Sequence, residues 1–348
     1  MTGNRFQQAL DIIFVPFKIL ASKAFLLWMI IAWISFYAFS YIWMDEAFGN
    51  FIALLRDNMF IQVPFILFLV SALMNLIRAS KKSFQQSRAG YLFWLILPLG
   101  VIIFFSGFFL SVIQREQGQR ILGEGDIIDP PWSNDKYSLI DINPGLRDSL
   151  LDIDSGMGIF SHEPKLTVID RFSQKSEIGA FPPKKLNDTY YHILNLGIAP
   201  GVRLLQGENI ISQGYMILRI LMPGSSDFFE IPPYPYKFIV SLDPEKKIQK
   251  GRVSASEFNL KQPQYNVRVF KGEKIIAEGN SRNGIKLDNM ILDFYKPIYW
   301  ALVEAVKDPA LPVMHAGVVL ITFGVPLYFM RLLFVFLKRE NIFKRLAQ

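Results

Sequence analysis

The chain has 348 residues, of which 51% are hydrophobic and 19% charged, with a net charge of +7 and no cysteine. Without cysteine it forms no disulfide, no thiolate metal site and no thioether link to haem. Twelve basic but only two acidic residues lie in three short segments beside apolar stretches, which leaves 25 basic and 28 acidic residues elsewhere. Because the rest of the chain is not basic, the charge does not indicate nucleic-acid binding.

Residues 1–24 precede the first apolar stretch and are expected to form a cytoplasmic lead-in. Within them, Phe6–Leu20 places apolar residues at mixed i, i+3 and i+4 spacing. This pattern favours a helix lying in the membrane interface, but a short turn into the first span also agrees with it.

Three apolar stretches follow within residues 25–113, and a fourth begins residues 310–337. None of them contains Asp, Glu, Lys or Arg, and their limits are Leu26–Met44, Phe60–Ile77, Ala89–Ile113 and Ala310–Met330. Each has roughly the 18–25 residues that an α-helix needs to cross about 30 Å of hydrocarbon. The sequence therefore predicts four transmembrane helices, followed by a basic tail at 338–348.

The basic segments lie at 5–23, 78–88 and 331–345. Basic residues near the ends of spans mark the cytoplasmic side of a membrane. We therefore expect both termini and the 78–88 loop to be cytoplasmic and residues 114–309 to be exported. In a bacterium this corresponds to a multi-pass protein of the inner (cytoplasmic) membrane with a large extracytoplasmic or periplasmic domain.

The exported segment 114–309 has the pattern of a β-rich domain. Short runs of alternating apolar residues are separated by Pro-Pro pairs, and Tyr265–Gly279 has the pattern of a hairpin that turns at 271–274. We expect a sandwich or partly open barrel of roughly eight strands. Residues 288–306 are predicted to be helical, with an interruption at Pro297, and to lead into the fourth span.

No catalytic motif is found in the chain, so we do not expect an enzyme. The acidic residues between Asp148 and Glu163 approach the spacing of a calcium loop. Met157, however, stands where the sharp turn of that loop requires glycine, so a solvated loop is favoured and no metal site is predicted. His162 and His192 are expected to be surface residues or hydrogen-bonded core residues.

His315 lies about six residues into the fourth apolar stretch. An ionisable group within a span is a functional candidate, because its burial in lipid is unfavourable. His315 is therefore a candidate axial haem ligand, although near the membrane surface an imidazole also serves as an interfacial anchor.

Two pairs of glycines stand seven residues apart, Gly100 with Gly107 and Gly317 with Gly324. Seven residues are close to two helical turns, so each pair lies on one face of its helix and permits close helix packing. We predict a helix-packing seam, with the general frequency of glycine in membrane helices as the alternative. In the second stretch, Ser71 and Asn75 can hydrogen-bond to a neighbouring helix.

Beyond this layout, several segments resemble the ResB (also called CcsB) family of cytochrome c biogenesis proteins. The segment most specific to that family is VKDPALPVMHAGVVLITFG (Val306–Gly324). Others are ILASKAFLLWMIIAW (Ile19–Trp33), FILFLVSALMNLIR (Phe65–Arg78), LGVIIFFSGFFLSVI (Leu99–Ile113), PKLTVIDRF and ENIISQGYMILRI. The similarity extends over nearly the whole chain. Members often carry a histidine in the region of Leu95–Leu99, where this sequence has none.

The resemblance implies a membrane component that works with a ResC/CcsA-type membrane protein. Such a pair delivers haem, transiently bound as haem b, to apocytochrome c outside the cytoplasm. The chain would position haem and apocytochrome rather than catalyse a step. A different interpretation is a membrane anchor or scaffold whose exported domain binds a partner such as a multihaem cytochrome.

Overall fold

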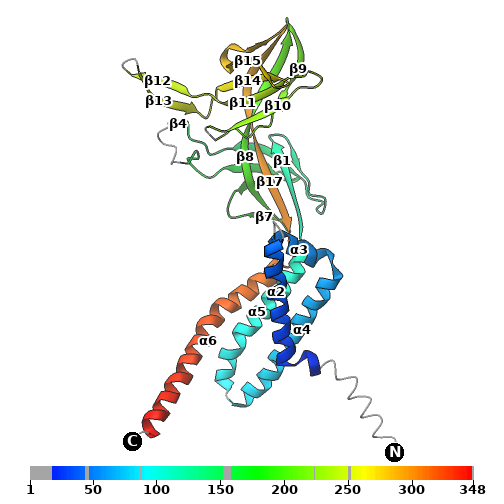
Figure 1. The fold of residues 1–348 in the computed structure, drawn as a ribbon, viewed down its shortest axis with the longest axis vertical. Helices are drawn as coiled ribbons and strands as arrows, with labels where there is room; N and C mark the ends of the chain where they lie inside the picture. The colour runs from blue at the N-terminus through cyan, green and yellow to red at the C-terminus, as the bar shows by residue number, and fades with distance from the viewer. Residues whose placement is uncertain are drawn as a thin grey trace, which may run out of the picture. The chain divides into compact units, whose positions relative to one another are not determined.

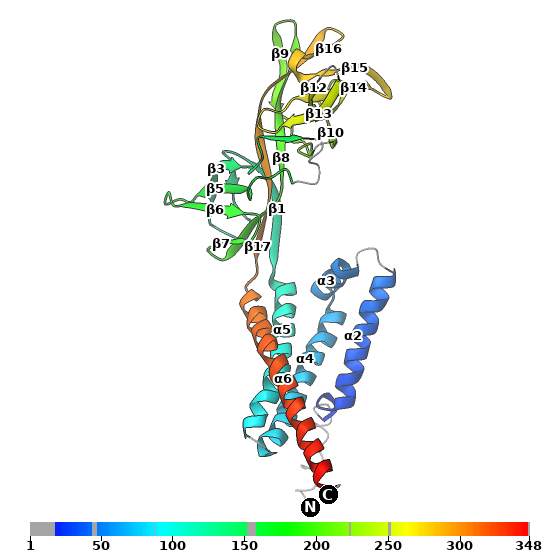
Figure 2. The ribbon, with the colours of Figure 1, turned by 90° about the vertical axis from the view of Figure 1, so that its left-hand side faces the viewer.

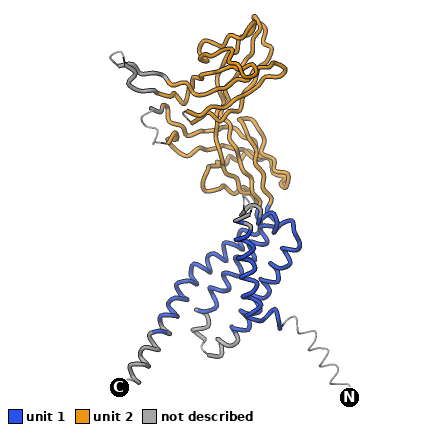
Figure 3. Tube along the Cα trace, viewed as in Figure 1, with its two compact units in different colours: residues 1–115, 308–348 blue, residues 116–307 orange. Residues whose placement is uncertain are grey.

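The structure, a computed structural model, describes residues 18–43, 47–86, 88–151, 158–222, 224–249 and 252–346. It divides into two compact units (Figure 3). A helical unit comprises Met1–Arg115 and Asp308–Gln348, and a β unit comprises Glu116–Lys307.

The helical unit contains the helices α2 (Lys23–Trp43), α3 (Ala47–Asp57), α4 (Met59–Gln86), α5 (Arg88–Gln114) and α6 (Leu311–Leu346). Three segments are long and apolar enough to cross a membrane, namely Met59–Ser80, Trp94–Gln114 and Leu311–Leu333. In α2 the corresponding apolar part is shorter, Lys23–Phe39. Length and composition therefore support three of the four predicted spans.

Two features of the helices differ from the prediction. The short helix α3 was not expected; Leu55 within it is fully buried. In addition, α6 does not end near residue 337 but continues through the basic tail to Leu346. Lys and Arg are good helix formers, and nothing before residue 346 breaks the helix after Pro326.

A small aromatic core joins four of the helices. Phe65 of α4 stacks on Phe109 of α5 with ring centroids 5.2 Å apart, and Trp33 of α2 meets Phe65 edge-on at 5.3 Å. Leu55 and Val112 complete this buried cluster. Aromatic pairs in these geometries add to the apolar contact itself, so the cluster stabilises the packing of α2 and α3 on α4 and α5.

The β unit is built around two long antiparallel strands, β8 (Thr189–Gln206) and β17 (Met290–Lys307) (Figures 1 and 2). Next to them in the same sheet lie β1 (Glu116–Gly123) and β16 (Ile285–Leu287) on β17, and β7 (Lys184–Leu186) and β9 (Asn209–Tyr215) on β8.

Three smaller sheets complete the β unit. One contains β2 (Ile127–Ile128), β3 (Tyr137–Asn143), β5 (Lys165–Ile169) and β6 (Lys175–Gly179). A second contains β10 (Ser226–Glu230), β11 (Lys237–Leu242), β14 (Tyr265–Lys271) and β15 (Lys274–Asn280). The third contains β4 (Ser149–Leu151), β12 (Glu245–Gln249) and β13 (Arg252–Asn259).

One hydrophobic core runs through the unit. Trp300 of β17 is the largest fully buried side chain among the described residues. The indole N–H donates to the carbonyls of Ile198 (3.3 Å) and Leu218 (3.2 Å). The ring covers Gly197, where an added Cβ would lie only 2.2 Å from it. Only glycine at this position lets the tryptophan reach its two acceptors.

The prediction of a β-rich domain is confirmed, with two corrections. The described part of the unit forms four sheets with more strands than the eight expected. Residues 288–306, predicted to be helical, form β17 instead. A strand buried on both faces has a nearly continuous apolar sequence, which periodicity does not distinguish from a helix. Pro297 lies at a β-bulge, where proline is tolerated. The hairpin at 265–279 is confirmed, with Lys271 paired to Lys274.

Candidate functional site

The four glycines lie where α5 and α6 pack against each other (Figures 1 and 2). A Cβ added at Gly317 would lie 2.5 Å from the backbone nitrogen of Phe104, and one at Gly107 would lie 2.7 Å from that of Met314. At Gly100 and Gly324 the nearest atoms, at 2.8 and 2.7 Å, include backbone of the facing helix. The backbones of α5 and α6 thus touch along four positions, which we call the glycine seam.

Asp308 fixes one end of the glycine seam. Its carboxylate oxygen Oδ1 accepts the Ala310 N–H (3.0 Å), as an N-cap residue does at the start of a helix such as α6. The other oxygen, Oδ2, accepts a hydrogen bond from the buried Ser111 hydroxyl of α5 (2.5 Å). One side chain therefore begins α6 and attaches it to α5.

His315 is the fifth residue of α6, and its side chain is exposed on the helix surface. It is not part of the glycine seam, because the neighbouring Gly317 is the residue that faces α5. The imidazole is thus available to a molecule outside this chain.

Polar side chains on α4 hold the chain just before α2. Ser71 Oγ donates to the carbonyl of Leu20 (2.6 Å), and Arg78 donates to that of Ala21 (2.9 Å). Asn75 lies between them and donates to the Ser22 carbonyl at 3.4 Å. The helical structure is interrupted at residues 21–22, so the carbonyls of Leu20 and Ala21 lack helical partners, and α4 supplies them. The Ser22 carbonyl also accepts the Leu26 N–H of α2 (3.2 Å). The sequence indicated Ser71 and Asn75 as interhelical donors but not Arg78.

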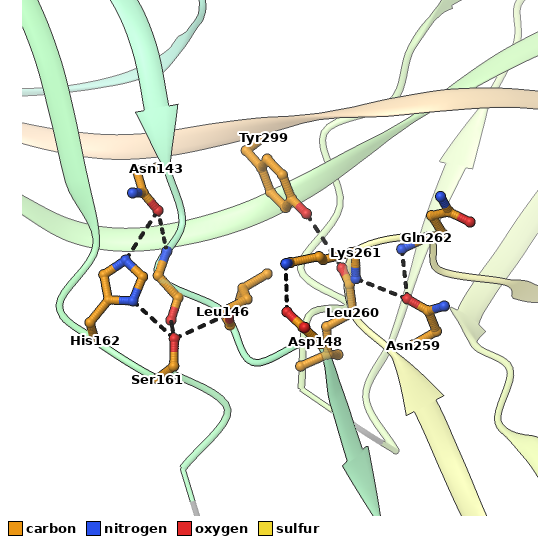
Figure 4. A network of polar contacts seen from close by, with 11 residues as sticks. Asn143, Leu146, Asp148, Ser161, His162, Asn259, Leu260, Lys261, Gln262 and Tyr299 are labelled. Atoms are coloured by element: carbon orange, nitrogen blue, oxygen red, sulfur yellow. Dashed lines mark hydrogen bonds and ion pairs between the residues drawn. The ribbon is translucent and has the colours of Figure 1, made fainter.

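Figure 4 shows a network around His162 that places serine, histidine and asparagine in a row. Ser161 Oγ lies 2.9 Å from His162 Nδ1, and Asn143 Oδ1 lies 3.3 Å from Nε2. A catalytic serine would direct its proton to the imidazole. Here, however, the Ser161 hydroxyl donates to the carbonyls of Gly145 and Leu146, at 2.9 and 3.3 Å. The network therefore joins residues 143–146 to residues 161–162, with the serine proton directed to backbone carbonyls.

His192 belongs to a polar row across three strands of the long sheet. Its Nε2 lies 3.4 Å from Glu304 of β17, and Gln119 of β1 donates to the same carboxylate at 3.1 Å. The side chains of His192 and Glu304 are only 20% and 15% exposed. His192 is thus half-buried and has an acidic partner.

A pocket of about 640 Å³ lies beside β17 in the β unit. Residues 293–297 of β17 form one wall, and residues 261–265 with Ser281 and Arg282 form the other. Sequence reasoning missed this pocket because it forms where distant segments meet. The only local signal is Pro297, which in the sequence indicates a break in a helix.

Among the residues that the structure describes, no group of three His, Cys, Asp or Glu side chains could hold a metal ion. Asp152 and Asp154 of the calcium-like loop lie outside the described residues. Asp148 instead pairs with Lys261 (2.5 Å), and Glu163 accepts the Phe181 N–H (2.8 Å). Comparison of the chain with models of known protein families and with curated proteins gives no match.

Proposed function

We propose that this chain is a ResB-like membrane component of c-type cytochrome biogenesis. It works with a ResC/CcsA-type membrane protein and assists the presentation of haem to apocytochrome c outside the cytoplasm. The observation that carries the proposal is the place of the segment Val306–Gly324, which has the strongest resemblance to the family. This segment contains the end of β17, the Asp308 cap and half of the glycine seam.

The proposal places α2, α4, α5 and α6 across the bacterial inner membrane. The location of the β unit depends only on α5, because this helix separates the basic 78–88 loop from residue 116. With that loop in the cytoplasm, the β unit is exported. The C-terminus is then cytoplasmic because α6 crosses back. The N-terminus is cytoplasmic as well if α2 crosses, and the 21 helical residues of α2 are enough to do so.

In this role haem is cargo, held only transiently. Haem requires an apolar slot and one or two axial ligands. This chain offers the exposed imidazole of His315. In this role the partner membrane protein supplies the pocket, and His315 contributes one ligand from the outer surface of α6. The chain itself performs no covalent step and acts by holding its partners in contact.

A second candidate is a permanent scaffold, in which the β unit anchors a partner such as a multihaem cytochrome to the membrane. The pocket beside β17 favours it, because a pocket of this size binds a ligand or peptide without any chemistry. The two candidates differ in whether haem attachment depends on the chain.

Deletion of the chain in its native host, followed by haem staining of membrane and soluble fractions, separates the candidates. The biogenesis role requires c-type cytochromes to lose covalent haem. A scaffold role requires one cytochrome to keep its haem but leave the membrane. Normal haem staining in the membrane fraction would refute both.

The contribution of His315 is tested by complementing the deletion with His315→Ala. We expect this variant to restore little covalent haem, whereas Val319→Ala, at another exposed position of α6, restores it fully. Equal restoration by both variants would remove His315 from the haem path.

A further inference from the structure

The long sheet has an open edge at β9. This strand pairs with β8 on one side and has no strand partner on the other among the described residues (Figure 2). None of its seven residues is buried. Besides the bonds of the sheet, the one hydrogen bond found to its backbone comes from the Tyr295 hydroxyl, which donates to the Gly214 carbonyl (3.2 Å). The outward peptide groups of β9 therefore have no partner within the described part of the chain.

The charge of β9 differs from that of the other edge strands. Among the described strands of five or more residues, β1, β6, β10, β12 and β15 also lie at sheet edges, and each carries at least two charged residues. The sequence of β9, NIISQGY, contains no charge and no proline. Charged residues and proline discourage another strand from adding to an edge. Of these edge strands, only β9 lacks that protection.

Exposed apolar side chains stand near both ends of β9. Ile210 is 53% exposed and Tyr215 is 46% exposed. They share one face of the sheet, because Ile210 lies opposite Leu205 of β8 and Tyr215 lies opposite Gly201, four residues away on the same strand. Across Gly201, Tyr215 meets Tyr295 of β17 edge-on, with ring centroids 5.4 Å apart. Two apolar rows thus cross the sheet and end at the open edge.

Charge does not select the ligand of this edge. Arg203 lies opposite Gln213 of β9, but Asp293 compensates its charge at 2.5 Å. Glu208 precedes the strand, in the turn from β8. Because β9 itself is neutral, the fit of an added strand depends on its main chain and on its apolar side chains.

A second copy of the chain fits this edge poorly. Glu116 and Lys307 pair at one end of the long sheet, and the helices α5 and α6 are attached there. Antiparallel pairing of β9 with its own copy would place these attachment points at opposite ends of the joined sheet. Both copies belong in one membrane, however, so this arrangement is unfavourable. A strand from a different polypeptide carries no such constraint.

From these observations we propose that the open edge of β9 binds an extended, uncharged segment of a partner polypeptide as an added β-strand. The peptide groups of β9 bond to the main chain of the segment. Aromatic and β-branched side chains on one face of the segment continue the rows that end at Ile210 and Tyr215, since such cross-strand pairs are favourable. The inference rests on the proposed function only in that a partner protein docks on the β unit.

The test uses the full chain in nanodiscs of zwitterionic lipid and the fluorescein-labelled peptide Thr-Val-Thr-Tyr-Thr-Val-Thr, which matches β9 in length. Fluorescence anisotropy measures the Kd, and empty nanodiscs give the background of lipid binding. We expect saturable binding to the chain. The same peptide methylated on three consecutive central nitrogens, which blocks both of its edges, should bind at least about tenfold more weakly. Replacing Val and Tyr by Ser should weaken binding at least about fivefold.

Each peptide tests one part of the proposal. Absence of saturable binding would refute it altogether. Equal binding of the methylated peptide would overturn strand addition, and equal binding of the Ser-substituted peptide would overturn the apolar character of the occupant.

Two matched variants locate the site. Ile210→Lys places a charge on the open edge, and Ile275→Lys places one on β15, an edge strand where the isoleucine is 52% exposed. We expect Ile210→Lys to weaken peptide binding at least about tenfold and Ile275→Lys to change it less than about twofold. Equal effects of the two variants would exclude β9 as the site.

Light scattering of nanodiscs that hold one chain each tests self-pairing. We expect the discs to remain separate. Discs that associate, and that Ile210→Lys separates, would show that β9 pairs with a second copy and would overturn the choice of occupant. None of these measurements depends on haem staining in the host, so failure of this site is distinguishable from failure of the proposed function.

Discussion

The glycine seam gives the sharpest test of how the helical unit is held together. Gly317→Ala adds one methyl group that would lie 2.5 Å from the backbone nitrogen of Phe104 and 2.6 Å from its Cα. These are backbone atoms, so no rotation of a side chain relieves the contact. Ordinary van der Waals contact for a Cβ begins at 3.4 Å, and α6 must therefore move away from α5 by about 1 Å.

The free-energy change follows from two opposing effects. Overpacking a tight contact costs about 1–3 kcal/mol, and a backbone clash belongs at the upper end of this range. A gap of 0.5–1 Å opened beside the clash also forfeits roughly a quarter to a half of the dispersion attraction there. Against this, alanine is about 1 kcal/mol better than glycine within a helix. We therefore expect Gly317→Ala to lower the free energy of unfolding by about 2 kcal/mol.

The assay is unfolding of the full chain in mixed detergent micelles by increasing SDS, followed by far-UV circular dichroism. Ala316→Val serves as the control, because it enlarges the exposed neighbouring residue. Gly107→Ala should destabilise similarly, and the double variant should lose less than the sum, since helices already pushed apart accept the second methyl. A Gly317→Ala protein as stable as the Ala316→Val protein would refute the close backbone contact.

Three further predictions concern other contacts. Ser71→Ala should cost about 1–3 kcal/mol because it leaves the half-buried Leu20 carbonyl without its donor. Ser80→Ala, which removes an exposed bond within α4, should cost little, and equal SDS midpoints of the two variants would contradict this. A double-mutant cycle of Ser111→Ala and Asp308→Asn should give a coupling of about 1–2 kcal/mol in the same assay, and additive effects would show that the bond is absent. Burial raises the pKa of the Tyr265 hydroxyl above its unfolded value near 10. The contribution of the neutral hydroxyl to the free energy of unfolding is therefore fully present below about pH 10. As the pH rises further this contribution is lost, by up to about 1.4 kcal/mol per pH unit. Tyr265→Phe should therefore reduce the alkaline slope of stability measured by denaturant unfolding, and an unchanged slope would contradict the assignment.

The sequence indicated the features that depend on local pattern. The spans in α4, α5 and α6 were visible because an uncharged apolar run of that length rarely occurs outside a membrane helix. The hairpin at 265–279 was visible because a glycine, Gly272, stands between two strand-like runs. A two-residue turn requires a positive φ, which glycine allows, and Gly272 adopts φ +60°. Both signals lie within one segment, where spacing alone carries the information.

Features that depend on distant contacts were not visible. β17 was predicted to be a helix because its burial comes from β8, almost a hundred residues earlier, and no local pattern reports that partner. Among the described strands, β16 and β1 pair with the two ends of β17 and leave residues 293–299 without a strand partner on that edge. Arg78 was counted only as a cytoplasmic charge, yet it also holds the chain before α2 through the Ala21 carbonyl.

Inserting a large β unit between two helices raises the question of how the ends of the insertion are held together. Closing a flexible loop of about 190 residues costs roughly 5 kcal/mol of entropy. The chain closes this loop in each unit separately. In the β unit Glu116 pairs with Lys307, and in the helical unit Ser111 binds Asp308 beside the glycine seam. Each unit holds its own two chain ends together, so neither unit needs the other to offset the entropic cost of closing the loop. Partner binding on the β unit is thus compatible with an intact membrane anchor, as the proposed role requires.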